Sequence, residues 1–331
     1  MNLRPPLKSA LVVATREVPG VLAVDAPGVA VTLKNGPKDR FDRPGLLQHI
    51  RGADVVISMY SDKVDAEFLD AAGGQIRGVC NLAVGYENID LAECATRGVL
   101  VGNTPDAVTE GTADMAWLLI LATARRLIEA DRFARSGDWA KHGPLGMAEF
   151  LGQDLTGKTL LILGAGRIGY ATALRSVGWG MMVLYVARSQ HLEFEMAPLA
   201  AERVSLHDGL ARADVVSIHT PLTAETRHLI DARAFAAMKS GAILVNTSRG
   251  PVVDEQALVD AMKAGKLWGA GLDVFEREPE VHADLKAMTN VVLSPHIGSA
   301  AARFRAVMTQ FACENAAAIV LGKRPPHPVT G

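Results

Sequence analysis

Three short segments hold side chains that could act together in catalysis. The segment 246–251 contains a guanidinium, Arg249, and the segment 273–279 contains carboxylates. The segment 294–299 contains an imidazole, His296. Each segment directly follows an apolar run that is typical of a buried strand. Open α/β sheets build their sites at the carboxyl ends of strands, so we expect the three groups to lie at one edge of a sheet.

The reduction of a 2-keto acid by hydride transfer needs this set of groups. Arginine can hold a substrate carboxylate with its planar fork. The carbonyl oxygen gains negative charge as hydride arrives, so it needs a donor and then a proton. Histidine supplies that proton near neutral pH, and a neighbouring carboxylate favours its protonated form. Taken singly, each group could also be a solvated surface charge, and His296 could be a capping or core histidine.

A glycine loop with the pattern G-x-G-x-x-G directly follows the apolar run 159–163, and a helical pattern comes next. This is the strand–loop–helix context that a dinucleotide-binding motif requires, although an ordinary turn remains the competing interpretation. The first glycine allows the tight turn, the second lets a pyrophosphate approach the backbone, and the third lets helix and strand pack closely. The helix N-terminus offers N–H groups to the phosphates. The cofactor-binding residues predicted in this loop are Gly164, Gly166, Arg167, Ile168 and Gly169.

The residues after the next strand predict which cofactor is preferred. NAD-specific domains of this type place Asp or Glu about 20 residues beyond the glycine loop, on the ribose 2′-OH. Here that position holds Ala187, followed by Arg188 and Ser189. Alanine leaves room for a 2′-phosphate, to which Arg188 and Ser189 can bind. We expect NADP(H) to be preferred and NAD(H) to be possible, unless Glu193 or Glu195 turns inward.

The elements that must position these groups alternate between strand and helix along the whole chain. A long helix is expected over residues 109–136, and a last helix over 299–321 should pack back on the first domain. Apolar runs without polar alternation predict parallel strands covered on both faces, at residues 11–14, 29–33, 54–58, 98–101, 159–163, 182–185, 214–218, 242–245, 269–273 and 291–293. We therefore predict an α/β chain with two doubly wound, Rossmann-like or flavodoxin-like domains built on parallel sheets.

Composition limits the classes of function. The chain has 331 residues, enough for two domains, and its formal net charge of −2 gives no sign of nucleic-acid or membrane binding. Cys80, Cys94 and Cys313 show neither a disulfide framework nor metal-ligand spacing, so no metal site is expected. The sequence shows no apolar signal-peptide region and no uninterrupted apolar run of about 18 residues. These features predict a cytoplasmic protein.

Eight segments match the motifs of one enzyme family in the right order, and the match covers nearly the whole chain from about Ala53 onward. They are residues 84–90, 103–106, 110–114, 164–169, 219–223, 246–251, 273–279 and 294–298. Through them the chain resembles the D-isomer-specific 2-hydroxyacid dehydrogenases, and within that family the glyoxylate and hydroxypyruvate reductases. The resemblance implies NAD(P)H-dependent reduction of a small 2-keto acid to the 2-hydroxy acid.

The resemblance also implies a role for each catalytic side chain. Arg249 would bind the substrate carboxylate and polarise the carbonyl. His296 would be the general acid in reduction and the general base in oxidation. Glu278 would pair with His296, since the family places the functional glutamate directly before a proline, which excludes Glu276.

Binding residues follow from the same resemblance. Backbone N–H groups of Val84 and Gly85 would hold the substrate carboxylate. Besides the glycine loop and residues 187–189, the cofactor-binding residues implied are Thr112, Thr220, Thr247, Ser248, Asp273 and Gly298.

The family's fold implies a substrate domain over residues 1–104 and 299–331 and a dinucleotide-binding domain over 105–298, in a homodimer. Two alternatives stay open. One is a dehydrogenase for another 2-hydroxy acid. The other is a nucleotide-sensing scaffold like the C-terminal-binding-protein corepressors, which share this fold and these catalytic residues. The chain lacks the long disordered tails of such scaffolds, so we expect an enzyme.

Overall fold

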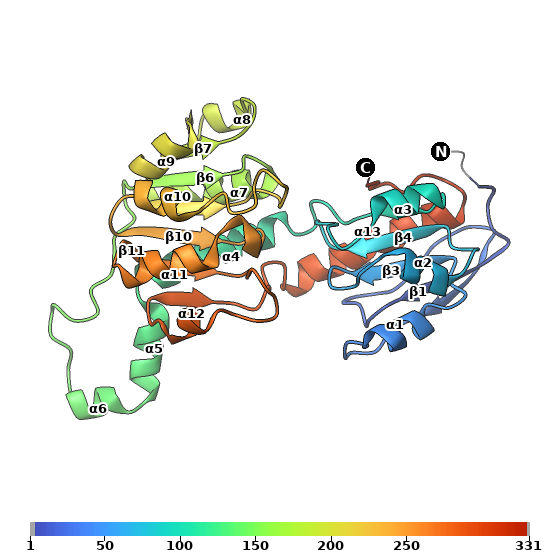
Figure 1. Ribbon diagram of the computed structural model, residues 1–331, viewed down its shortest axis with the longest axis horizontal. Helices are drawn as coiled ribbons and strands as arrows, with labels where there is room; N and C mark the ends of the chain where they lie inside the picture. The colour runs from blue at the N-terminus through green and yellow to red at the C-terminus, as the bar shows by residue number, and fades with distance from the viewer. Residues whose placement is uncertain (1–3, 330–331) are drawn as a thin grey trace. The chain divides into compact units, whose positions relative to one another are not determined.

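The computed structural model describes residues 4–329, which form two compact α/β units (Figure 1). Unit 1 comprises Met1–Val108 and Ala300–Gly331, and unit 2 comprises Thr109–Ser299. The chain therefore passes from one unit to the other twice. The boundaries expected from the sequence were placed after residues 104 and 298.

Unit 1 contains a five-stranded parallel sheet in the order β2-β1-β3-β4-β5. This is the flavodoxin-like order of doubly wound sheets. All residues of β4 are buried, as a strand covered on both faces requires. The strands are β1 (Ser9–Ala14), β2 (Ala30–Lys34), β3 (Val55–Met59), β4 (Gly78–Leu82) and β5 (Leu100–Gly102).

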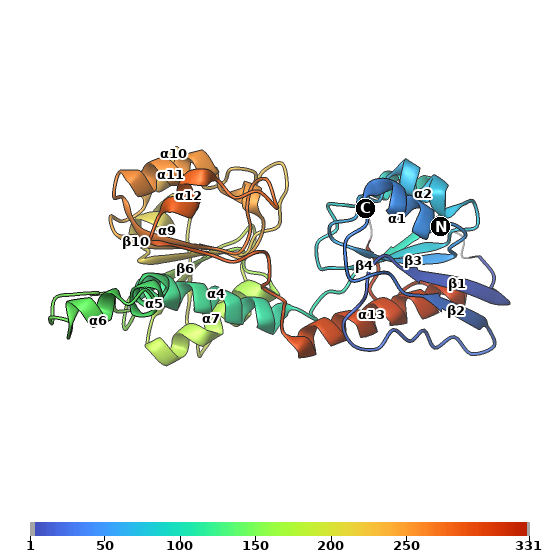
Figure 2. The same ribbon diagram turned by 90° about the horizontal axis from the view of Figure 1, so that it is seen from below.

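Helices cover both faces of this sheet. On one face, α1 (Arg43–His49), α2 (Ala66–Ala72) and α3 (Leu91–Thr96) contribute to a single hydrophobic core. On the other face, α13 (Ala302–Val320) packs along β3 and β4, as Figure 2 shows. The expectation that the last helix packs on the first domain is therefore confirmed.

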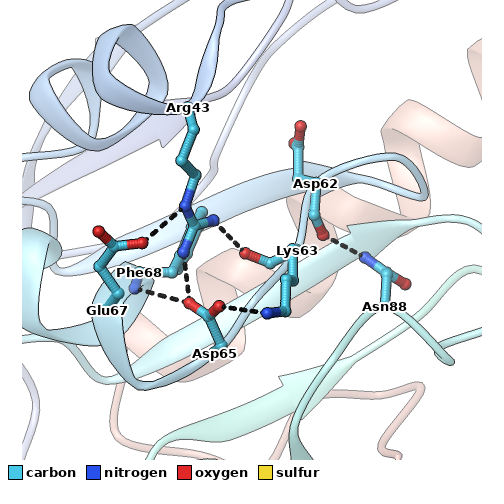
Figure 3. A network of polar contacts seen from close by, with 7 residues as sticks. All are labelled: Arg43, Asp62, Lys63, Asp65, Glu67, Phe68 and Asn88. Carbon is cyan, nitrogen blue, oxygen red and sulfur yellow. Dashed lines mark hydrogen bonds and ion pairs between the residues drawn. The ribbon is translucent and has the colours of Figure 1, made fainter.

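Loops at the carboxyl edge of this sheet are joined by polar contacts (Figure 3). The guanidinium of Arg43 in α1 binds the carboxylate of Asp65, which caps α2. In the same loop, the carbonyl of Asp62 accepts a hydrogen bond from Nδ2 of Asn88 at 2.8 Å. The loop after β3 is thereby fastened to the segment 83–90, which follows β4.

Unit 2 contains a seven-stranded parallel sheet in the order β12-β11-β10-β9-β6-β7-β8. Counted from β6, this is the Rossmann order 3-2-1-4-5-6 with one added strand. The strands are β6 (Thr159–Leu163), β7 (Met182–Val186), β8 (Glu202–Arg203), β9 (Val215–Ile218), β10 (Ala242–Asn246), β11 (Leu267–Leu272) and β12 (Val291–Leu293). The two sheets confirm the predicted fold class.

The helices of unit 2 lie on both faces of its sheet, with α4 and α7 opposite α10, α11 and α12 (Figure 2). The α-helices are α4 (Thr109–Ala124), α5 (Leu127–Arg135), α6 (Asp138–His142), α7 (Arg167–Arg175), α8 (Leu192–Glu195), α9 (Leu206–Arg212), α10 (Ala232–Ala237), α11 (Glu255–Lys263) and α12 (Ala283–Ala287). Two 3₁₀ turns, η1 (Ser176–Trp179) and η2 (Gly250–Val252), complete the unit. Within residues 4–329, no helix is both long enough and apolar enough to cross a membrane.

The single helix expected over residues 109–136 is wrong. Helix α4 ends at Ala124, and Arg126 adopts a left-handed conformation with φ of 53° before α5 begins. Helix α4 is apolar around most of its surface and packs against β10 and β11, whereas α5 contains no buried residue. The break falls where the sequence changes from apolar to charged, so the chain leaves the core at that point.

Candidate active site

The three predicted catalytic segments follow three adjacent strands. Arg249, Glu278 and His296 come after β10, β11 and β12, which pair in parallel with one another. The carboxyl ends of parallel strands meet at one edge of the sheet. Unit 2 therefore brings these side chains to one place, as the sequence predicted.

Asp273 holds the loop that contains His296. Its Oδ1 accepts hydrogen bonds from Oγ of Ser294 at 2.6 Å and from the N–H of Ile297 at 2.9 Å. Its Oδ2 accepts from the N–H of Gly298 at 2.7 Å. His296 itself has a left-handed backbone with φ of 54°, which costs a non-glycine residue about 1 to 2 kcal/mol. The bonds from Asp273 offset that cost, so this residue, predicted to bind the cofactor, orients the loop.

The imidazole of His296 pairs with Glu278. Its Nδ1 lies 2.8 Å from Oε2 of Glu278, and Oε1 of Glu278 accepts from the N–H of Phe275 at 3.0 Å. Burial works against ionisation of Glu278, but the hydrogen bond from His296 and the charge of Arg249 bring its pKa below the usual value. A carboxylate on Nδ1 fixes the orientation of the ring and leaves Nε2 to face a substrate.

The neighbouring glutamate, Glu276, has a different partner. Its Oε1 lies 2.8 Å from Nε2 of His228, and its backbone N–H donates to Oε1 of Glu255 at 2.6 Å. Two glutamates two residues apart thus pair with two different histidines. Sequence reasoning did not identify His228, because its pairing depends on a contact between residues 48 positions apart.

Arg249 lies beside this pair because two loops approach closely. Oδ1 of Asn246 accepts from the N–H of Ser248 at 3.0 Å, and its Nδ2 donates to the carbonyl of Arg249 at 3.0 Å. At Gly250, an added Cβ would lie 1.9 Å from the backbone of Phe275. Only glycine permits this approach, so the loop that contains Arg249 is held against the loop that leads to Glu278.

The glycine loop lies where the strand order reverses, between β6 and β9. Gly164 has φ of 102°, and an added Cβ would lie 2.8 Å from the backbone of His219 and Thr220. An added Cβ on Gly169 would lie 2.2 Å from the carbonyl of Gly164, whereas one on Gly166 would meet nothing within 4 Å. The first and third glycines therefore serve packing, and the second leaves space in front of α7. Helix α7 begins at Arg167 and Ile168 without a side-chain cap.

Buried polar atoms in the loops after β9 and β10 fit a dinucleotide. Within residues 4–329, no hydrogen-bond partner meets Oγ1 of Thr220, Oγ1 of Thr247 or Nδ1 of His219. A buried polar atom left unpaired costs about 1 to 3 kcal/mol, and a bound cofactor can supply the missing partner. Thr220 and Thr247 were predicted to bind the cofactor, whereas His219 was not. Burial lowers the pKa of His219 to about 3, so its ring is neutral.

Two further predicted residues lie together beside the catalytic loop. An added Cβ on Gly298 would lie 3.5 Å from Cγ2 of Thr112 and 3.0 Å from Oδ2 of Asp273. Thr112 belongs to α4 and is buried. Helix α4 thus reaches the same edge of the sheet as the loop after β12. Ser248 lies in the Arg249 loop described above.

Ala187, Arg188 and Ser189 form the loop after β7. The guanidinium of Arg203 donates to the carbonyl of Ala187 at 3.0 and 3.2 Å and to that of Arg188 at 2.8 Å. These bonds hold the loop from β8, a strand that the sequence did not predict.

The two nearby acids have other partners. Glu195 accepts a hydrogen bond from the hydroxyl of Tyr185 at 2.6 Å, and Glu193 lies 3.0 Å from His191. Glu195 also accepts from the side-chain amide of Gln190. Neither carboxylate occupies the position after β7 that an acid takes in NAD-specific domains.

Val84 and Gly85 belong to unit 1, in the segment that follows β4. They lie at the carboxyl edge of the five-stranded sheet, at the same kind of position that the catalytic loops occupy in unit 2.

Comparisons with known proteins identify the family of the chain. Residues 117–298 match the model of the D-isomer specific 2-hydroxyacid dehydrogenase, NAD binding domain. The chain is 49% identical to a glyoxylate reductase of Thermococcus onnurineus over 288 residues, which are 86% of this chain and 85% of that protein.

Solved structures are similar over the whole chain. A glyoxylate reductase from Paecilomyes thermophila has a TM-score of 0.83 and 31% identity, covering 98% of this chain and 99% of that one. An NADPH-dependent glyoxylate/hydroxypyruvate reductase from Sinorhizobium meliloti, in complex with NADP and malonate, has a TM-score of 0.80 and 30% identity, with 97% of each chain covered. The chain therefore belongs to the D-isomer specific 2-hydroxyacid dehydrogenase family and is a nicotinamide-dependent oxidoreductase.

Proposed function

We propose that this protein reduces glyoxylate or hydroxypyruvate to the 2-hydroxy acid with NADPH, with His296 as the proton donor. The observation that carries the proposal is the His296–Glu278 pair beside Arg249 at the carboxyl edge of the seven-stranded sheet. The names of the relatives support the same substrates.

Each residue of this group has a defined part in the proposed reaction. A nicotinamide cofactor, when bound by the glycine loop, would supply the hydride that reduces carbon 2 of the substrate. Arg249 holds the substrate carboxylate and polarises the carbonyl, and the N–H groups of Val84 and Gly85 also bind the carboxylate. Nε2 of the protonated His296 gives its proton to the carbonyl oxygen, while Glu278 keeps the ring oriented through Nδ1. The products are the 2-hydroxy acid and the oxidised cofactor.

NADP(H) is the preferred cofactor in this proposal, and NAD(H) remains usable. Ala187 leaves the 2′ position without a carboxylate, and the nearby Glu193 and Glu195 are bonded to His191 and Tyr185. A 2′-phosphate next to Arg188 and Ser189 therefore meets a cation and a hydroxyl rather than an acid.

A substrate panel tests the proposal. We expect kcat/KM to be highest for glyoxylate and hydroxypyruvate among small, branched and aromatic 2-keto acids, with each assayed in NADPH and in NADH. A clear preference for a bulky aromatic or branched keto acid would overturn the substrate assignment. Negligible turnover on every 2-keto acid would overturn the reaction itself.

The protein is proposed to act as a homodimer that is formed through an arm, defined as residues 127–151. The arm contains α5, α6 and the loop that follows, and none of its residues is buried. Figure 1 shows α6 lying away from the sheet of unit 2. Apolar side chains are exposed along the arm, including Trp139 and Met147, of which Met147 is 97% exposed. A second copy of the chain would bury this surface.

A further inference from the structure

The N–H groups of Val84 and Gly85, which we propose bind the substrate, belong to a segment whose backbone is fixed by hydrogen bonds. The carbonyl of Ala83 accepts from the backbone N–H of Thr104 at 2.9 Å. The carbonyl of Val84 accepts from Nδ2 of Asn103 at 2.7 Å. The side chain of Asn103 is therefore bonded to the peptide group between Val84 and Gly85.

The next carbonyl in the segment is held in the same way. The carbonyl of Gly85 accepts from Nδ2 of Asn81 at 2.9 Å. Asn81 is fully buried in β4, and its Oδ1 accepts from Oγ of Ser58 in β3 at 3.0 Å. It also bonds to Asn88, which is fastened to Asp62 (Figure 3). The donors thus belong to the sheet and its polar network.

These bonds determine where the N–H groups point. A trans peptide unit directs its C=O and its N–H to opposite sides. With the Val84 carbonyl bonded to Asn103, the N–H of Gly85 points away from Asn103. The N–H of Val84 points away from Thr104 for the same reason. Neither N–H donates a hydrogen bond within the part of the chain that the structure describes.

We propose that Asn103 is a positioning residue for the substrate. Asn103 is 9% exposed, and its side chain orients the Val84–Gly85 peptide so that the N–H of Gly85 is presented to the substrate carboxylate. This inference rests on the proposed function, in which that carboxylate is the group the segment binds. It assigns a task to Asn103 that the catalytic residues of unit 2 do not perform.

The test replaces Asn103 with leucine, which has the same number of side-chain heavy atoms, branched in the same way, and carries no hydrogen-bond donor. Without the bond to its carbonyl, the Val84–Gly85 peptide can rotate. We expect KM for glyoxylate to rise about 10-fold, the usual worth of one hydrogen bond to a charged group. We expect kcat to change less than about 3-fold, because the contact exists in the bound substrate as well as in the transition state.

Binding measurements complement the kinetics. The dissociation constant of oxalate, measured by calorimetry on the holoenzyme, should rise by the same factor, whereas that of NADPH should stay unchanged. Asn103→Ala serves as a second variant if the leucine variant does not fold. Gln75→Leu is the matched control, because Nε2 of Gln75 also donates to a backbone carbonyl, that of Ala72, at 2.6 Å. This control should keep the parent's KM and oxalate affinity.

Each outcome decides one claim. Unchanged KM and oxalate affinity in the folded Asn103 variants would overturn the inference, and so would an equal loss in Gln75→Leu. A parent protein that binds no oxalate overturns it as well. If the parent reduces no 2-keto acid but binds oxalate in a way that depends on Asn103, the proposed reaction fails and the positioning role stands.

Discussion

Unit 2 contains two His–Glu pairs, so the role of His296 as the proposed general acid can be tested with the second pair as a control. In the His296–Glu278 pair, removal of the imidazole removes the proton donor. We expect His296→Gln to lower kcat by about 10²- to 10⁴-fold, the usual worth of a positioned general acid. The dissociation constant of NADPH, measured by fluorescence titration, should change little.

The control is His228→Gln, which breaks the pair with Glu276. Its kcat should stay close to that of the parent, because neither member of that pair is assigned to the reaction. A His296→Gln enzyme with near-normal turnover, or a His228→Gln enzyme that is equally slow, would show that the wrong pair has been assigned.

His219, whose ring nitrogen Nδ1 is buried, gives the protein a pH dependence of stability. Burial lowers its pKa to about 3, whereas a histidine in an unfolded chain titrates near 6.5. Between these values the unfolded chain binds a proton that the folded chain does not, so the free energy of unfolding falls as pH drops below about 6.5. We expect cofactor-free His219→Asn to lose less stability than the parent between pH 7 and pH 5.

Urea unfolding at both pH values measures this difference. His207→Asn is the control, since His207 is exposed, and it should follow the parent. Equal losses of stability in the parent and in His219→Asn would contradict the prediction.

For single residues, the sequence predicts those that directly follow a strand. It does not predict residues whose role depends on a contact with a distant part of the chain. Arg249 and His296 could be located because each stands a few positions beyond an apolar run, whereas Glu278 was chosen over Glu276 through the family resemblance. The bonds of Arg203 to residues 187 and 188 depend on the distance between β7 and β8, and no local pattern encodes that distance.

The loop after β7 determines the proposed choice of cofactor, so it is the element to change. Ala187→Asp places a carboxylate where a 2′-phosphate would lie, and like charges repel. We expect the ratio of kcat/KM for NADPH to that for NADH to fall in this variant. Glu193→Gln removes an acid that is already bonded to His191, so it should leave the ratio unchanged. A parent enzyme that favours NADH tenfold would show that this loop has been misinterpreted.

The other elements show why strands are easier to predict than helix ends. Strands such as β6 and β10 are buried on both faces, and their uninterrupted apolar runs indicate this directly. The strand β4 is also fully buried, but it was not predicted, because Gly78 and Asn81 interrupt its apolar run. The edge strand β8 has two charged, exposed residues and gives no such signal. The break between α4 and α5 was missed because helix-forming residues continue through it, and only the burial of α4 ends there.

At the scale of the whole molecule, the arm predicts an assembly. Replacing both Met147 and Leu151 by aspartate puts charges on the surface that a second copy would bury. We expect the parent to behave in light scattering as a dimer of 35.1 kDa chains and the double variant to behave as a single chain.

Val21→Asp is the control for the arm. Val21 is 78% exposed and belongs to unit 1, outside the arm, so this variant should stay dimeric. If the parent protein is monomeric at every concentration tested, the arm does not form a homodimer and the proposal is wrong.

The double passage of the chain between its units has a consequence for biosynthesis. Unit 2 is continuous in sequence, so all of its strands have been made once the ribosome has translated Ser299. The sheet of unit 1 is made first, yet α13, which covers one face of β3 and β4, is made last. At about 5 to 20 residues per second, translation of the intervening unit takes roughly 10 to 40 seconds. During that time the face of the five-stranded sheet that α13 later covers stays exposed. We therefore expect chaperones near the ribosome to bind unit 1 rather than unit 2.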